Sequence, residues 1–348
     1  MTEDVHDLVI AGSGVAGLSA AVYAARADLD PLVLEGDEPG GQLTLTTDVE
    51  NYLGFPDGVG GMDLVRRGKE QAEQFGAEFR HGRIEAAALD GQPLELSLSA
   101  GDTLHTRSLI VATGASARWV GAENEDELMG HGLSTCATCD GAFHRGDDVL
   151  VVGGGDSAME EALFLAKFAD SVTVVHRREE LRASEIMADR ARDHDDVQFR
   201  WNTELEAIHG SREEGVTGAT LVSHPEGYPR EKAESGPDVE RETVDAGGVF
   251  YAVGHTPNTR FLEDTGVGRD ENGYVFTEPD DDGRSTARTA VDGVFAAGDV
   301  ADPRYRQAVT SAGTGSMAAL DAEAYLETLR DADGSTGTTT ASPEQPAP

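Results

Sequence analysis

Basic residues are scarce in this sequence, and lysine is nearly absent. Of 348 residues, 27 are lysine or arginine and 65 are aspartate or glutamate, a formal net charge of −38. The only lysines are Lys69, Lys167 and Lys232. Such a surface repels phosphate backbones and anionic lipids, which argues against nucleic-acid or membrane-surface binding. Because the acids are spread along the chain, we expect a solvated acidic shell suited to a cytoplasm of very high salt.

Cysteines and long apolar runs are also few. Two cysteines cannot support a disulfide-stapled scaffold, and no apolar stretch approaches the ~20 residues that cross a membrane. The first residues lack the basic region of a secretory signal. We therefore expect a soluble cytoplasmic protein. Its length predicts roughly two domains of about 150 residues each, large enough to fold without disulfides or a structural metal.

A buried strand, a glycine-rich turn and a helix occur in succession twice. The first copy, over residues 8–35, contains Gly12, Gly14 and Gly17 and ends on Glu35. Gly12 permits a tight turn, Gly14 lets a pyrophosphate approach the backbone, and Gly17 allows close packing of helix on strand. A carboxylate at Glu35 is placed to accept hydrogen bonds from ribose hydroxyls. This copy predicts a dinucleotide site; a plain glycine-rich turn is the alternative.

The second copy, over residues 149–176, differs where it ends. His176 replaces the acid and is followed by Arg177, Arg178 and Arg182. Guanidinium groups bind a 2′-phosphate through charge-assisted pairs, whereas a carboxylate would repel it. We therefore predict NADP(H) rather than NAD(H) at this site, with casual surface charge as the alternative.

Both cysteines fall in one motif, Cys136-Ala-Thr-Cys139, followed by Asp140. This spacing suits a redox disulfide in which one thiolate attacks and the other resolves. A zinc site completed by His131 and His144 remains an alternative, as do buried inert cysteines. Asp140 could hold or transfer a proton at a thiolate leaving group, or it could cap a helix or lie in a turn.

The order and spacing of these motifs resemble low-molecular-weight bacterial and archaeal thioredoxin reductases, which are FAD/NAD(P)-dependent pyridine nucleotide-disulfide oxidoreductases. The resemblance covers about 320 residues, and the acidity suggests a halophilic archaeon. It rests on residues 12–17, 40–43, 49–51, 112–114, 136–140, 153–158, 176–178, 254–258, 298–300 and 305–313. No single motif decides it.

The resemblance implies an α/β fold with two Rossmann-like, three-layer dinucleotide-binding domains. An FAD-binding domain would comprise residues 1–116 and 249–330, and an NADPH-binding domain with the redox cysteines would be inserted at 117–248. Hinges would lie near the two junctions. We expect a final helix to end at about Leu329 and a disordered tail over 331–348.

The resemblance also assigns residues to the two cofactors. Residues expected at FAD are Gly12, Gly14, Gly17, Glu35, Gln42, Asn51, Asp299, Arg306, Gln307 and Ala308. Residues expected at NADPH are Gly153, Gly155, Ser157, His176, Arg177, Arg178 and Arg182.

The implied activity is a thioredoxin-disulfide reductase. Electrons would pass from NADPH to FAD, then to the Cys136–Cys139 disulfide, and finally to thioredoxin or a thioredoxin-like protein. By resemblance, Cys139 lies nearer the flavin, Cys136 attacks the substrate, Asp140 is the acid–base partner, and the enzyme is a homodimer without a metal.

Nicotinamide and the cysteine pair must both reach one flavin, although both belong to the inserted domain. Hydride transfer needs near-contact of about 3–3.5 Å, so we predict a domain rotation that presents them alternately.

Three competing functions are a dithiol oxidase that uses dioxygen, a flavoprotein that reduces ferredoxin or a peroxide-reducing partner, and a non-enzymatic nucleotide-binding scaffold. The arginines argue against the oxidase, which needs no NADPH. The single cysteine pair argues against the flavoprotein that reduces ferredoxin or a peroxide-reducing partner. The cysteines and the arginines together argue against a non-enzymatic scaffold.

Overall fold

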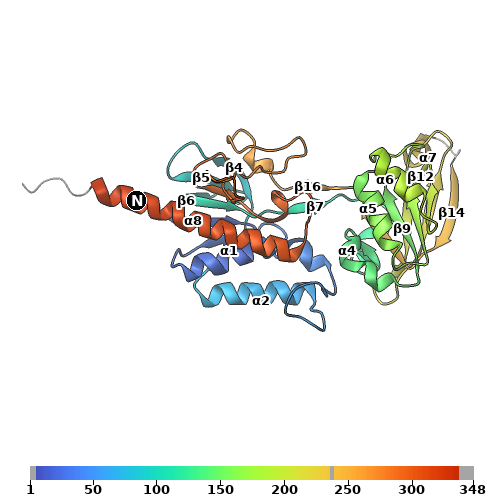
Figure 1. Cartoon of the computed structure of the whole chain (residues 1–348), viewed down its shortest axis with the longest axis horizontal. Coiled ribbons are helices and arrows are strands. Elements are labelled where there is room, and N and C mark those ends of the chain that lie inside the picture. Colours follow the sequence, from blue (N-terminus) through green and yellow to red (C-terminus); the bar gives the residue numbers. More distant parts are fainter. Residues whose placement is uncertain (1–4, 236–238, 337–348) are drawn as a thin grey trace, which may run out of the picture. The chain divides into compact units, whose positions relative to one another are not determined.

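The computed structural model describes residues 5–235 and 239–336, which form two compact units. The first unit comprises residues 5–43, 63–115 and 257–336, and the second comprises 44–62, 116–235 and 239–256. Both units contain parallel strands and helices (Figure 1). The α/β class and the insertion of one unit into the other are confirmed.

The first unit is built on a seven-stranded sheet whose central strands are parallel. Its order is β3-β2-β1-β6-β5-β4, and β17 pairs with β6. The strands are β1 (Val5–Ala11), β2 (Leu32–Leu34), β3 (Glu78–Arg80), β4 (Ile84–Ala88), β5 (Leu94–Leu98), β6 (Thr103–Val111) and β17 (Val294–Ala296). Only the β4–β5 and β5–β6 pairs are antiparallel. The apolar runs of β1 and β6 are buried on both faces, as a covered parallel sheet requires.

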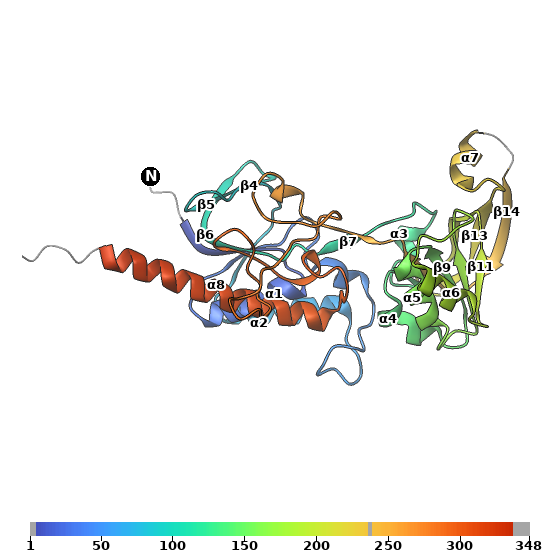
Figure 2. The ribbon, with the colours of Figure 1, turned by 45° about the horizontal axis from the view of Figure 1, so that its top comes forward.

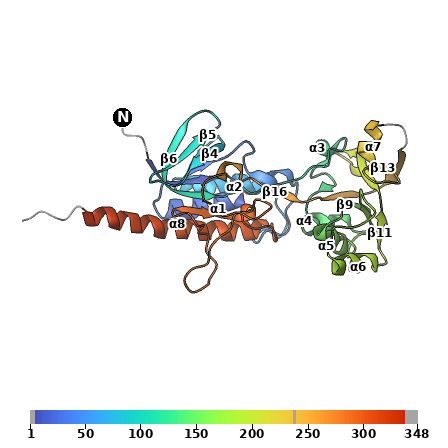
Figure 3. The same cartoon turned by 90° about the horizontal axis from the view of Figure 1, so that it is seen from above.

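Small residues allow the helices of this unit to pack closely. Alanines of α1 (Val15–Arg26) and α8 (Ala308–Thr336) share one buried cluster. A Cβ on Gly315 would lie 2.1 Å from the carbonyl oxygen of Ala16, so only glycine permits this approach. Figure 3 shows α1, α2 (Gly61–Gln74) and α8 running side by side. Three short 3-10 helices, η1 (Gly41–Leu45), η3 (Arg260–Leu262) and η4 (Gly298–Val300), complete the unit.

Helix α8 is longer than predicted. It begins at Ala308 and continues to Thr336, beyond the expected end near Leu329. The helix thus includes residues 331–336, although composition predicted disorder from 331. The rest of the predicted tail, 337–348, lies outside the described residues. No helix in the described part of the chain has the length and apolar character of a membrane span.

The second unit contains a five-stranded parallel sheet of order β11-β10-β9-β15-β8. The strands are β8 (Leu133–Ser134), β9 (Asp148–Gly153), β10 (Ser171–Val175), β11 (Val197–Arg200) and β15 (Gly248–Ala252). Its helices are α3 (Glu125–Leu128), α4 (Ala137–Asp140), η2 (Gly141–His144), α5 (Asp156–Leu165) and α6 (Glu185–Arg192). Phe250, in the middle of β15, is fully buried in the core under α5.

A three-stranded antiparallel sheet forms the other layer of this unit (Figure 2). It consists of β12 (Thr203–Ser211), β13 (Gly215–Ser223) and β14 (Glu240–Asp245), with α7 (Pro229–Ser235) between the last two. The sequence of residues 211–248 is polar and rich in turn-forming residues, yet it supplies two of these strands. Alternating apolar side chains such as Leu205 and Leu221 pack against Leu150 and Val249 of the parallel sheet. Short strands β7 (Ala115–Ala117) and β16 (His255–Pro257) pair where the chain passes between units.

Candidate functional site

In the turn after β1, there is space for a Cβ atom at Gly14 but not at Gly12 or Gly17. A Cβ on Gly12, whose φ is +111°, would lie 2.2 Å from the oxygen of Ala112, and one on Gly17 would lie 1.9 Å from the oxygen of Gly12. A Cβ on Gly14 would meet only Gly40, at 3.8 Å. Gly12 and Gly17 are therefore required by the packing of the protein itself, whereas Gly14 keeps its side of the turn open.

The N-terminus of α1 is free to receive an anion. Gly14 occupies the N-cap without a capping side chain, and the first turn carries no acidic residue. The leading amides and the positive end of the helix dipole are therefore available to phosphate oxygens.

Glu35, directly after β2, is mostly buried and paired with Lys69 of α2. Lys69 Nζ donates to Glu35 Oε1 at 2.6 Å and also lies 4.7 Å from the centre of the Phe79 ring. Lys69 was not among the predicted site residues, and the rarity of lysine is its only sequence signal. This contact fixes the orientation of the carboxylate at the end of the strand.

Asp299 lies in η4 and is largely buried. Its Oδ1 accepts a hydrogen bond from the Ser311 hydroxyl at 3.0 Å. Burial raises its pKa to about 6, and the Ser311 hydrogen bond opposes this shift. A Cβ on Gly298 would lie 2.7 Å from the Ala16 Cβ, so η4 packs directly against the start of α1.

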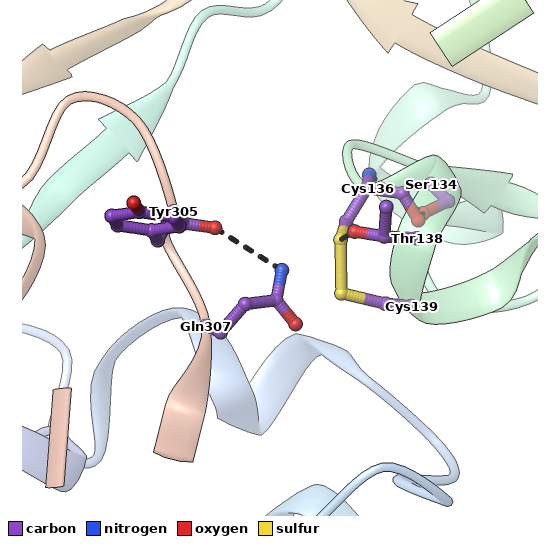
Figure 4. The surroundings of a disulfide bond; sticks show 6 residues. All are labelled: Ser134, Cys136, Thr138, Cys139, Tyr305 and Gln307. Atoms are coloured by element: carbon purple, nitrogen blue, oxygen red, sulfur yellow. Dashed lines mark hydrogen bonds between the residues drawn. A yellow bond between two sulfur atoms is a disulfide. The ribbon is translucent and has the colours of Figure 1, made fainter. Parts of the chain in front are cut away.

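The remaining FAD candidates are not all brought together. Gln42 follows Gly40, whose amide donates to the Ser13 hydroxyl at 3.0 Å, so this segment lies against the glycine turn. Gln307 leads into α8, where its side-chain amide donates to the Tyr305 carbonyl at 3.2 Å (Figure 4). Arg306 and Ala308 flank Gln307 at the same helix start. Asn51 lies in segment 44–62, which groups with the second unit.

In the second glycine turn, which follows β9, one glycine is likewise required by packing and another leaves an open face. A Cβ on Gly153 would lie 2.5 Å from the Ala252 oxygen, whereas one on Gly155 would meet nothing within 4 Å. Gly155 is the N-cap of α5 and has no capping side chain, and Ser157 lies in the first turn of that helix. This turn likewise has an open face at Gly155. Unlike α1, the first turn of α5 carries an acid, Asp156, whose Oδ1 accepts hydrogen bonds from the amide and the hydroxyl of Ser184.

His176 is buried beneath this turn. Its Nδ1 lies 3.0 Å from the Gly153 oxygen and its Nε2 lies 2.9 Å from the Glu180 oxygen. Burial is the main cause that lowers its pKa, and the two backbone contacts oppose the shift. Both ring nitrogens therefore face backbone carbonyls, and a phosphate contact by His176 stays a prediction.

The three predicted arginines follow on the same loop. The Arg182 amide donates to the Gly154 oxygen at 2.7 Å, which holds the loop on the glycine turn. Arg177 and Arg182 are exposed, and Arg178 is half-buried. Within residues 5–235 and 239–336, none of the three forms an ion pair. Unpaired arginines are unexpected in so acidic a chain and leave their charge available to an anion.

Cys136 and Cys139 form a disulfide around the start of α4 (Figure 4). Their Cα atoms are 5.3 Å apart, and both residues are half-buried. The Cys136 amide donates to the Ser134 hydroxyl oxygen at 3.0 Å, and Cys136 Sγ lies 3.3 Å from Thr138 Oγ1. The disulfide leaves neither sulfur as a zinc-binding thiolate, and partial exposure contradicts the reading as buried inert cysteines.

Asp140 follows the disulfide and retains its proton more strongly than a free aspartate. Burial raises its pKa, opposed by a hydrogen bond with Ser134 and by the nearby His144. Its side chain makes no capping hydrogen bond to η2, which contradicts the capping alternative. His144 is itself held by Asp147, at 3.2 Å between Nδ1 and Oδ2. A carboxyl whose pKa is raised and that lies next to a redox disulfide in the sequence suits a group that holds or donates a proton at a departing thiolate.

This chain is similar to known proteins over most of its length. The family model described as pyridine nucleotide-disulphide oxidoreductase matches residues 6–315. A thioredoxin reductase of Mycolicibacterium smegmatis is 47% identical over 325 residues, 93% of this chain and 98% of that protein. A bifunctional thioredoxin reductase/thioredoxin of Mycobacterium leprae is also 47% identical, and the chain spans 66% of its length. The crystal structure of thioredoxin reductase from Streptococcus pyogenes is 37% identical, covers 94% of this chain and 100% of its own, and superposes with a TM-score of 0.83.

Proposed function

The chain belongs to the pyridine nucleotide-disulphide oxidoreductase family, and we propose on that premise that it is an NADPH-dependent thioredoxin-disulfide reductase. The observation that carries this function is the half-exposed Cys136–Cys139 disulfide in a chain with two open glycine turns. The enzyme is a flavoprotein that uses FAD and NADPH. Its substrate is thioredoxin or a thioredoxin-like protein.

The first unit fits FAD. Bound FAD supplies a two-electron acceptor and donor between nicotinamide and disulfide. Gly14 and the α1 amides hold the pyrophosphate, and Glu35, oriented by Lys69, accepts hydrogen bonds from the adenosine ribose. Asp299 holds the ribityl–phosphate end. Gln42, Asn51, Arg306, Gln307 and Ala308 belong to the same proposed FAD site.

The second unit fits NADPH. The open face at Gly155 and the first turn of α5, which includes Ser157, accommodate the pyrophosphate. Arg177, Arg178 and Arg182 supply positive charge for the 2′-phosphate, while buried His176 supports the turn from below. We therefore assign FAD to the first unit and NADPH to the second. The domains expected from the sequence, 1–116 with 249–330 for FAD and 117–248 for NADPH, differ from these units at 44–62 and at 249–256.

The cysteines exchange electrons with the protein substrate in two steps. The Cys136 thiolate attacks the thioredoxin disulfide, one substrate sulfur leaves, and a mixed disulfide forms. Cys139 then attacks Cys136, which restores the Cys136–Cys139 disulfide and releases thioredoxin as a dithiol. Two electrons pass to thioredoxin, and Asp140 holds or donates a proton at the departing sulfur.

Domain rotation completes the proposed cycle. Nicotinamide and the cysteine pair belong to one domain and the flavin to the other, and both reactions need near-contact. Two states that alternate by rotation about the connecting segments meet this requirement. A covalent cross-link that fixes one orientation is expected to abolish turnover, and full activity of the cross-linked enzyme would contradict the rotation.

The natural setting of the enzyme is also part of the proposal. The net charge of −38 supports a cytoplasm of very high salt, as in a halophilic archaeon. The likeness to thioredoxin reductases supports a homodimer.

The direct test is NADPH-dependent reduction of purified thioredoxin by the FAD-loaded enzyme. The wild type is expected to turn over, and Cys136→Ser is expected to lose at least 100-fold in rate because its nucleophile is gone. Ser99→Ala, at an exposed serine directly after β5, keeps both cysteines and is the control that should retain activity. Flavin that stays oxidised when NADPH is added without oxygen would favour the oxidase alternative, and an unchanged Cys136→Ser rate would contradict the cysteine assignment.

A further inference from the structure

Tyr228 contacts both arginines that follow His176. It lies in the turn between β13 and α7, about 50 residues further along the chain. The Arg177 guanidinium carbon lies 5.1 Å from the centre of the Tyr228 ring, and that of Arg178 lies 5.3 Å from it. Both distances are within the range of cation–π attraction. One aromatic ring therefore holds two neighbouring positive charges.

The backbone fixes the ring in this place. The Tyr228 amide donates to the Arg177 oxygen at 2.9 Å, and a Cβ on Gly227 would lie 2.8 Å from the same oxygen. Tyr228 itself adopts a backbone φ of +50°, a value that residues other than glycine rarely adopt. The Asn202 amide donates to the Arg178 oxygen at 3.2 Å on the neighbouring residue. Main-chain contacts thus hold the turn at Gly227 and Tyr228 against the loop that carries Arg177 and Arg178.

The chemical type of the group that contacts Arg177 and Arg178 also favours anion binding by these arginines. In a chain with 65 acids and 27 bases, carboxylates are the usual partners of arginine, yet neither Arg177 nor Arg178 has one among the described residues. Arg178 Nε is buried and has no hydrogen-bond partner within the same residues. A carboxylate would neutralise the arginines and repel a phosphate. An aromatic face orders them and leaves their full charge available.

We propose that Tyr228 is a positioning residue for recognition of the 2′-phosphate, and that it sets the preference for NADPH over NADH by holding Arg177 and Arg178 side by side. The inference rests on the proposed NADPH-dependent function. It adds a specificity determinant from outside the strand–turn–helix motif, carried by the turn before α7.

The test compares variants of the FAD-loaded enzyme by calorimetric titration with 2′,5′-ADP and with 5′-AMP, which lacks the 2′-phosphate. Tyr228→Leu is expected to bind 2′,5′-ADP about tenfold more weakly and to bind 5′-AMP unchanged. KM for NADPH should rise by a similar factor, while kcat and the KM for NADH stay within about twofold. Tyr228→Phe, which keeps the ring, should restore wild-type values.

Phe168→Leu is the matched control, because Phe168 is another half-buried ring of the same unit under an arginine, Arg145 at 5.2 Å. It should leave the ratio of 2′,5′-ADP to 5′-AMP affinity unchanged. If Tyr228→Leu does not fold, replacement of Tyr228 by pentafluorophenylalanine keeps the ring shape and reverses its attraction for cations, and the same loss is expected.

The outcomes separate the two claims. A wild type that binds 2′,5′-ADP no better than 5′-AMP would contradict NADPH recognition itself, and the inference with it. If wild type prefers 2′,5′-ADP and Tyr228→Leu has the same ratio of 2′,5′-ADP to 5′-AMP affinity as wild type, only the role of Tyr228 is overturned. A Tyr228→Phe variant as weak as Tyr228→Leu would also overturn it, because the ring would then not be the cause.

Discussion

At the scale of single residues, burial and neighbouring charge give side chains of one type different properties. Asp299 is buried with one hydroxyl donor and a pKa of about 6, whereas Glu35 is paired with Lys69. Arg177 faces a ring, while Arg241 makes a double contact with Glu206 at 2.8 Å. These differences follow from packing in three dimensions rather than from residue type.

Asp299 gives a pH-dependent prediction. Its folded-state pKa is raised above the usual 3.8, so the stability from its protonated form is complete below about pH 3.8 and is lost as the pH rises through about 6. Asp299→Asn cannot ionise, so its unfolding free energy should gain about 3 kcal/mol relative to wild type between pH 3 and pH 8. Urea denaturation of the flavin-free proteins measures this difference. A difference between Asp299→Asn and wild type that does not change with pH would contradict the burial argument.

The sequence predicted the residues that carry a local motif and missed those that depend on distant contacts. The two cysteines, the glycines and the arginines stand in short patterns whose chemistry can be stated directly. Lys69 and Tyr228 contact Glu35 and the arginines from 34 and about 50 residues away, and no local pattern marks them. His176 was predicted at NADPH, which stays a prediction; the contacts of its two ring nitrogens with backbone carbonyls are marked by no local pattern.

At the scale of elements, the strand–turn–helix unit divides its glycines between packing and ligand approach. Gly17→Ala would place a Cβ 1.9 Å from a backbone oxygen, so it should lower the unfolding free energy by about 2–3 kcal/mol. Gly14→Ala meets only Gly40 at 3.8 Å, and its φ of −68° suits alanine. It should therefore leave the unfolding free energy of the flavin-free protein within about 1 kcal/mol, yet weaken FAD at least about tenfold by filling the space of the pyrophosphate.

Denaturation and flavin-fluorescence titration of this pair separate the two roles. The substitutions lie in one turn and add the same methyl group, so each serves as the control for the other. Equal effects of both on FAD affinity and on stability would contradict the division.

The two strand–turn–helix copies over residues 8–35 and 149–176 were predictable, because apolar runs mark their strands and glycines mark their turns. The antiparallel strands β13 and β14 were missed, because charged residues such as Glu240 and Glu242 occupy exposed strand positions in this acidic chain. The end of α8 was misplaced: the helix continues through 331–336, although the aspartates, glycine, serine and threonine of this segment are weak helix formers.

At the scale of the whole molecule, the charge of −38 affects stability more than fold. The Debye length falls from about 10 Å at 0.1 M salt to about 3 Å at 1 M, which screens repulsion between neighbouring acids. Raising KCl from 0.1 to 2 M should therefore raise the thermal midpoint by on the order of 5 °C or more. Scanning calorimetry of the FAD-loaded enzyme measures it, and full stability and activity in dilute buffer would contradict the high-salt setting.

The central claim is that the Cys136–Cys139 disulfide lies on the electron path from NADPH. Anaerobic titration with NADPH, followed by flavin absorbance, tests it most directly. Because wild type holds one flavin and one reducible disulfide per chain, it should consume twice as many NADPH equivalents as Cys139→Ser before the flavin is fully reduced. Equal consumption by the two proteins would show that the disulfide takes no electrons from the flavin and would contradict the account.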